Sequence, residues 1–168
     1  IERMNNGNKV GDLAKGLFGD FVDVTSYFGE KLNLPKMIAD TKTEMKKETS
    51  VICEASFDYN GIYCAVDILK AENDGWAICE VKSSIHDDKE VYLADIAYQK
   101  YVLENCGVKV SGSYLITINS DYIFDGNLDI HKLFRITDVS SEIVPEKNSI
   151  RGNLVIAEKL LRSGDEPD

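Results

Sequence analysis

The sequence predicts an α/β fold in which helices flank a mixed central sheet. An opening apolar pattern has helical spacing, and residues 49–84 are rich in β-branched and aromatic residues interrupted by turn signals. A further helical pattern then leads to one more strand-like segment. With 168 residues, 43% hydrophobic and 29% charged, the chain has the size and composition of a globular domain. We expect a single domain over residues 1–168, which fits a piece of a longer protein because it opens at Ile1 rather than Met.

The first two elements are predicted to be helices. Residues 6–19 carry apolar side chains at helical spacing, and Gly19 is a suitable stop signal. Residues 34–48 start with Pro35 in the first turn, where proline is tolerated and no backbone N–H is lost from the helix. We therefore expect two helices before the first long strand.

The middle of the chain is predicted to form a three-stranded antiparallel meander. Within residues 49–84, Asn60-Gly61 and the ENDG segment at 72–75 are hairpin signals. Residues 88–107 then have a helical pattern closed by Gly107, and residues 108–119 form another strand-like segment. A helix between two strands of one sheet usually makes them parallel. Residues 148–164 predict one more helix.

Composition limits the classes of function. No apolar run is long enough to cross a bilayer and no leader opens the chain, so we expect no membrane partner and a cytoplasmic location. The net charge of −10 disfavours general binding to phosphate backbones but leaves room for a locally basic cleft. The four cysteines have no paired spacing, so neither zinc nor an iron–sulfur cluster is supported within this chain. Those in apolar runs are expected to fill the core: Cys53, Cys64 and Cys79.

Three charged residues stand where a core favours Val and Ile. Asp67 lies in the nearly continuous apolar strand 61–69, and Glu80 and Lys82 project to one face of the next strand while Val81 turns away. If the two strands are hairpin neighbours, Asp67 meets this pair. A buried carboxylate needs a partner or a metal, and two carboxylates beside an ammonium form a hard-oxygen site suited to Mg²⁺ or Mn²⁺.

Other interpretations of these charges stay open at this point. Glu80 and Lys82 can form a solvated ion pair on an outer face, and Asp67 can cap a turn. Glu54, another acid within an apolar strand, is either a third acid of the site or an outward-facing residue.

The pattern Asp67, twelve residues, then Glu80-Val81-Lys82 on the adjoining strand of a meander resembles the signature of the PD-(D/E)XK nuclease superfamily. The segment DIAYQKYVLENCG, which carries Gln99, is similar to the Gln-bearing helix of RecB-like and CRISPR-associated exonucleases, so the resemblance is to the RecB-like and lambda-exonuclease-like branch. The opening segment NGNKVGDLAKGLF also looks like the first helix of bacterial RecB-like proteins. The resemblance covers most of the chain and implies a restriction-endonuclease-like αβββαβ core.

This resemblance implies a metal-dependent DNA phosphodiesterase, in particular an exonuclease. Asp67 and Glu80 would hold Mg²⁺ or Mn²⁺, helped by the Val81 carbonyl and, as a further candidate ligand, Glu54. Lys82 would then activate water, and Gln99 would position it.

The sequence departs from the family in its first helix and after Gln99. Many RecB-like nucleases carry a metal-binding His four residues after a first-helix Gly, and here that offset from Gly7 falls on Gly11. Leu103 replaces the usual Tyr four residues beyond Gln99. Two alternatives follow: a catalytically inactive DNA-binding or scaffold module with the same fold, and an acidic protein-interaction domain.

Overall fold

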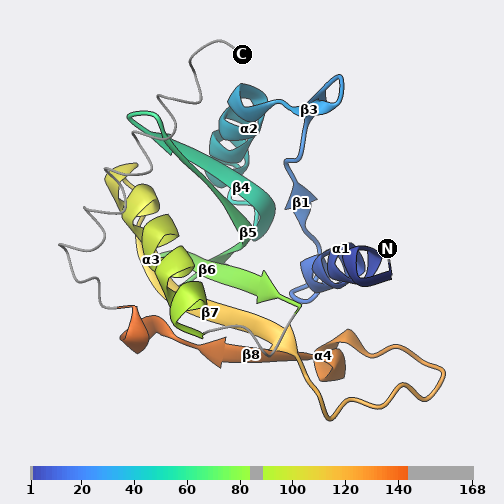
Figure 1. Cartoon of the computed structure of the whole chain (residues 1–168). Coiled ribbons are helices and arrows are strands. Elements are labelled where there is room, and N and C mark those ends of the chain that lie inside the picture. The colour runs from blue at the N-terminus through green and yellow to red at the C-terminus, as the bar shows by residue number, and fades with distance from the viewer. Residues whose placement is uncertain (1, 84–88, 144–168) are drawn as a thin grey trace.

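A six-stranded mixed sheet flanked by helices forms the centre of the protein (Figure 1). The computed structural model describes residues 2–83 and 89–143. The strands lie in the order β1-β4-β5-β6-β7-β8 and comprise β1 (Val22–Asp23), β4 (Val51–Tyr59), β5 (Ile62–Glu72), β6 (Gly75–Lys82), β7 (Val110–Ile118) and β8 (Phe134–Asp138). The helices are α1 (Glu2–Lys15), α2 (Leu34–Lys46), α3 (Lys89–Asn105) and the short α4 (Ile130–Leu133).

The predicted order of helices, three-stranded meander, helix and strand is confirmed. Strands β4, β5 and β6 are antiparallel neighbours, and β6 pairs with β7 in parallel across the α3 crossover. The first helix begins earlier than predicted and ends at Lys15, followed by a turn that Gly19 closes with a φ of 94°. The helix predicted at residues 148–164 lies outside the described residues.

The two hairpin turns have the backbone geometry that their residues favour. Asn60 and Gly61 adopt φ values of 51° and 87°, and Asn73 adopts 55°. In the Asn60-Gly61 turn, positive φ at both central residues matches the right-handed twist of the flanking strands, whereas in the turn at 72–75 only Asn73 of the two central residues has a positive φ. The turns therefore fix the register that places charged residues of neighbouring strands side by side.

Each face of the sheet has its own hydrophobic core. On one face α3 and the end of α2 cover a core that includes Ile52, Val66 and Ile96. On the other face α1 covers a smaller core that includes Ala14, Ile68 and Ile116 (Figure 1). Three cysteines fill these cores as predicted: Cys53, Cys64 and Cys79.

The sheet opens between β5 and β6. Their pairing runs from the turn at Glu72↔Gly75 only as far as Ile68↔Cys79, so the first half of β5 pairs with β4 and the last residues of β6 pair with β7. We call this opening the fork. Side chains of α3 lie against it, and the Tyr98 hydroxyl donates to the Tyr63 carbonyl of β5 at 2.9 Å. The fork is where the charged residues of both strands gather.

Several short elements were not predicted from the sequence. They are β1, β8, α4, the 3-10 turn at Ser140–Glu142, and a small separate hairpin of β2 (Tyr27–Phe28) and β3 (Lys31–Leu32). No helix within the described residues has the length and apolar character needed to cross a membrane.

Candidate functional site

The fork brings Asp67 and Glu80 together. Continuing the pairing by one step beyond Ile68↔Cys79 sets Asp67 opposite Glu80. Because the strands part here, the Asp67 side chain reaches the neighbouring strand, and its Oδ2 accepts the Val81 backbone N–H at 2.9 Å. Besides burial, the charge of Asp67 raises the pKa of Glu80, so the two carboxyl groups interact electrostatically. The two acids that the sequence singled out therefore belong to one charged cluster at the fork.

Lys82 lies between acidic side chains of the strand and of α3. Its Nζ is 3.3 Å from Glu80 Oε1 and 3.4 Å from Asp95 Oδ2. It also lies 5.0 Å from the centroid of the Tyr92 ring, a cation–π contact. The Lys82 side chain is only 26% exposed, so β6 and α3 together hold its ammonium beside Glu80.

Gln99 of α3 contacts the same carboxylate. Its Nε2 donates to Glu80 Oε2 at 2.7 Å, and Gln99 is 7% exposed. The other oxygen of this amide, Oε1, is buried without a hydrogen-bond partner within the described part of the chain. A buried polar atom without a partner is unfavourable and therefore uncommon. Gln99 Oε1 can accept a hydrogen bond or contact a cation at the fork.

Glu54 joins the site from β4 through an unusual backbone conformation. Its φ of 58° interrupts the pairing between Cys53↔Ile68 and Ala55↔Val66, which sets it opposite Asp67. A non-glycine residue with this conformation inside a strand is uncommon and is concentrated at functional sites. Of the two interpretations left open for Glu54, the structure supports a third acid beside Asp67.

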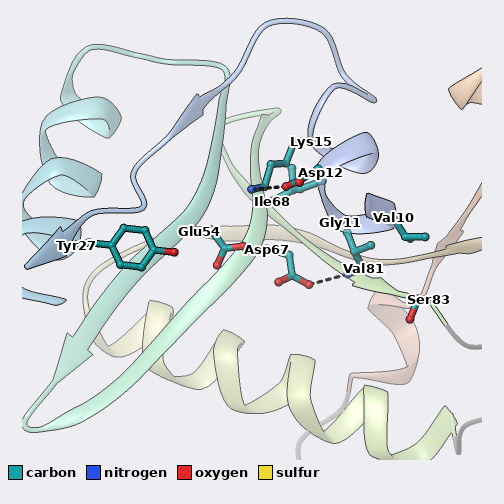
Figure 2. Close-up of a pocket in the computed structure, with 10 residues that line it drawn as sticks. All are labelled: Val10, Gly11, Asp12, Lys15, Tyr27, Glu54, Asp67, Ile68, Val81 and Ser83. Carbon is teal, nitrogen blue, oxygen red and sulfur yellow. Dashed lines mark hydrogen bonds and ion pairs between the residues drawn. The ribbon is translucent and has the colours of Figure 1, made fainter. Parts of the chain in front are cut away.

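An open cleft of about 490 Å³ leads to these carboxylates (Figure 2). Glu54 and Asp67 lie next to each other along it, and α1 forms part of the opposite wall. Glu80 lies behind Asp67, on the α3 side of the fork. The lining residues are Val10, Gly11, Asp12, Lys15, Tyr27, Glu54, Asp67, Ile68, Val81 and Ser83.

Burial and mutual repulsion perturb the titration of all three acids. Burial, followed by the charge of Asp67, raises the pKa of Glu80 to about 7. Burial also raises the pKa of Asp67, and the charge of Glu54 raises it further. The hydrogen bond from the Val81 N–H acts in the opposite direction but does not outweigh burial. For Glu54, burial is again the main cause of a raised pKa. Ionising all three acids at once is therefore unfavourable, because Lys82 alone does not offset their burial and mutual repulsion.

Lys82 is a stable cation in this environment. Burial acts to lower its pKa, but the carboxylates of Glu80 and Asp95 outweigh burial, and the net pKa is raised. Lys82 is therefore an ammonium near neutral pH. It can donate hydrogen bonds to water or to a phosphate, and it does not act as a resting proton acceptor.

The donors at the fork fit a hard divalent cation in chemistry, although no preformed cage is present. Within residues 2–83 and 89–143, no three His, Cys, Asp or Glu side chains are arranged to hold a metal ion together. Asp67 and Glu80 supply two carboxylates with raised pKa values, and Gln99 Oε1 is an unpaired buried oxygen. Mg²⁺ is usually held by one or two carboxylates and retains several waters, so such a cation fits this set.

The wall of the cleft has an open position at Gly11. This residue lines the cleft with Asp67 and Val81, and a Cβ added to it would meet no atom within 4 Å. By the sequence resemblance, Gly11 corresponds to the position at which many RecB-like nucleases carry a metal-binding His. The structure shows open space around a Cβ at this position.

The sequence did not indicate three other residues of the cleft. Lys15 Nζ is 2.8 Å from Asp23 Oδ2 and 3.3 Å from Asp12 Oδ1. These two ion pairs hold the Lys15 ammonium group on the α1 wall of the cleft. Tyr27 of the small hairpin extends toward Glu54 in Figure 2. The spacing of Asp12 and Lys15 predicts an ion pair on one helix face, but no local pattern shows that this face meets the fork.

Comparisons of the chain with protein-family models, with curated proteins and with solved structures find no match. The residues gathered at the fork, with the sequence signature that they carry, are therefore the features that bear on function.

Proposed function

We propose that this protein is a metal-dependent DNA phosphodiesterase of the PD-(D/E)XK type, acting as an exonuclease of the RecB-like branch. The observation that carries the proposal is the convergence of Asp67, Glu80 and Lys82 from two adjacent antiparallel strands at a fork in the sheet. Gln99, from the helix that follows, contacts the same Glu80. Chain order and spatial arrangement both agree with the signature.

The order of elements gives further support. The run α2–β4–β5–β6–α3–β7 has the αβββαβ order, with β7 parallel to β6. We infer that this run is a restriction-endonuclease-like core, and that α1 and the hairpin β2–β3 complete the cleft around it.

Each residue at the fork has a distinct role in the proposed reaction. Asp67 and Glu80 would hold Mg²⁺ or Mn²⁺, with the Val81 carbonyl and Glu54 as further oxygen donors. When bound, the cation supplies positive charge that lowers the pKa of the attacking water and stabilises charge developing on the phosphate. Gln99 fixes the orientation of Glu80 through its 2.7 Å hydrogen bond.

Lys82 acts in this scheme as an ammonium. It orients the attacking water and balances phosphate charge through its N–H donors, and Asp95 keeps it in place. The attacking water gives a proton to solvent as its oxygen bonds to phosphorus, the ester P–O bond breaks, and the leaving oxygen takes up a proton from solvent. DNA is the proposed partner because the sequence signature is that of DNA nucleases.

One observation favours a second candidate, a DNA-binding module that retains the fold without catalysis. The open position at Gly11 removes the ligand that related nucleases use, and Asp67 and Glu80 alone form an incomplete cage. Such a module would bind DNA without cleaving it, and Asp67→Ala would leave its binding unchanged.

A cleavage assay separates the two candidates. Linear and covalently closed circular DNA are each incubated with the chain in Mg²⁺, in Mn²⁺ and in EDTA. An exonuclease degrades the linear form only, and only with metal. DNA that is bound but stays intact under all three conditions would favour the non-catalytic module, and cleavage of the circle would indicate an endonuclease.

A further inference from the structure

The hairpin β2–β3 exposes large apolar side chains beside the cleft. Tyr27 is 63% exposed and Phe28 is 81% exposed, while Leu32 of the paired strand is 49% exposed. Tyr27 lines the same cleft as Glu54 and Asp67, and its ring extends toward Glu54 (Figure 2). Exposed aromatic side chains gathered on one element beside a site indicate a surface that binds a ligand or a partner molecule.

The hairpin is built to present both of its rings. Tyr27 pairs with Leu32, and Phe28 pairs with Lys31, so the two pairs lie on opposite faces of the hairpin. It forms no part of the six-stranded sheet and stands away from it between α1 and α2 (Figure 1). The Asn33 N–H donates to the Ser26 carbonyl at 2.7 Å, which closes the base of the hairpin. A short hairpin thus holds one ring at the cleft and one ring beyond it.

The position of Tyr27 restricts what can cover it. A ligand that occupies the cleft meets Glu54 and Asp67, where the proposed function places a cation, at one end and the Tyr27 ring at the other. A nucleotide has both required groups, because its phosphate suits the cation and its base has a flat face that stacks on an aromatic ring. Bases inside a duplex already stack on each other, so only an unpaired base offers its face.

On these grounds, and resting on the proposed function, we propose that the hairpin β2–β3 is a stacking platform for unpaired bases. Tyr27 stacks on the base next to the scissile phosphate, and Phe28 stacks on a base farther along the strand. The substrate therefore enters the cleft as a single strand, either free or separated from its complement at a DNA end. Stacking does not depend on base identity, so the platform is indifferent to sequence.

Binding by a single-stranded oligonucleotide containing 2-aminopurine tests this role without relying on cleavage. The Lys82→Ala background is used with Mn²⁺, because it keeps both carboxylates. Tyr27→Ala should weaken binding of the single strand about tenfold, and binding of the matching blunt duplex by less than about twofold. Tyr27→Phe keeps the ring and should bind like its parent.

Phe124 provides the matched control. It is also 63% exposed but is not among the residues that line the cleft, so Phe124→Ala should change neither affinity. Equal losses on single strand and duplex after Tyr27→Ala, no loss on either, or no binding of the oligonucleotide would each overturn the platform.

Cleavage by the otherwise unchanged chain separates this inference from the proposed function. If the chain cleaves DNA and Tyr27→Ala leaves the preference between single strand and duplex unaltered, the platform is wrong while the nuclease stands. If single strands bind through Tyr27 and nothing is cleaved, the platform stands and the nuclease is wrong.

Discussion

The buried carboxyl group of Glu80 makes the stability of the metal-free fold depend on pH. In the folded chain Glu80 keeps its proton up to about pH 7, whereas an unperturbed Glu side chain loses it near 4.5. Between these values the folded state binds more protons than the unfolded state, so the free energy of unfolding falls as pH rises. The stabilising contribution is complete below the lower value and is lost once pH passes the higher one.

The size of this effect follows from the two pKa values. Their difference corresponds to on the order of 3 kcal/mol of free energy of unfolding, lost between the two values. Glu80→Gln removes the titrating group and keeps the shape of the side chain. The introduced amide can still accept from Gln99 and donate to Asp67. The variant should therefore be more stable than wild type at about pH 8, with a weaker dependence on pH down to about pH 5.

Urea unfolding of both proteins in EDTA at a series of pH values measures this directly, with fluorescence of the single tryptophan, Trp76, as the signal. Glu72→Gln is the matched control, because Glu72 is on the same strand as Asp67 but accepts from the Tyr114 hydroxyl, away from the fork. If Glu80→Gln were instead less stable than wild type at high pH, ionised Glu80 would be stabilising the fold through Lys82.

Three other changes, two at the fork and one on the α1 wall of the cleft, have defined outcomes. Asp67→Asn should match or exceed the metal-free melting temperature of wild type but lose most of the stabilisation by Mn²⁺, which is about 2.7 kcal/mol at a hundredfold excess over Kd. A much lower metal-free melting temperature would instead identify Asp67 as part of a structural ion pair. Lys82→Ala should abolish cleavage. Its circular dichroism spectrum should be unchanged, because the Lys82 side chain is partly exposed. Cleavage at the wild-type rate would mean that another group orients the attacking water. Gly11→His should tighten Mn²⁺ binding in calorimetry, since the space beside Asp67 is open, and unchanged affinity would place the ion elsewhere.

Local patterns in the sequence predict the central part of the fold well. Turn residues such as Asn60-Gly61 fix both the meander and its register, and the crossover rule gives the parallel pairing of β7. The short elements were missed because strands of two residues, such as β1, have no periodicity of their own. Their positions are decided by packing against the completed sheet.

From the residues alone, the candidate site was predictable only where its residues come from strands that are consecutive in sequence, and Gln99 of α3 was indicated only by the family resemblance. Asp67 and Glu80 meet because one hairpin joins their strands, so alternation and turn position suffice to place them together. Glu54 could not be assigned to a face, because its left-handed backbone breaks the alternation. Gly11 and Tyr27 reach the cleft through tertiary packing of α1 and the hairpin, which leaves no local signal.

The role of Asp67 in metal-dependent cleavage is measured with an end-labelled linear DNA. Wild type, Asp67→Asn and Glu72→Gln are each assayed in Mn²⁺ and in EDTA. If Asp67 helps to hold the cation that cleaves the phosphodiester bond, wild type and Glu72→Gln should release labelled nucleotides at similar rates in Mn²⁺ and none in EDTA. Asp67→Asn should be slower by at least about a hundredfold. Cleavage that persists in EDTA, equal rates for Asp67→Asn and wild type, or no cleavage by wild type in Mn²⁺ would contradict this role of Asp67.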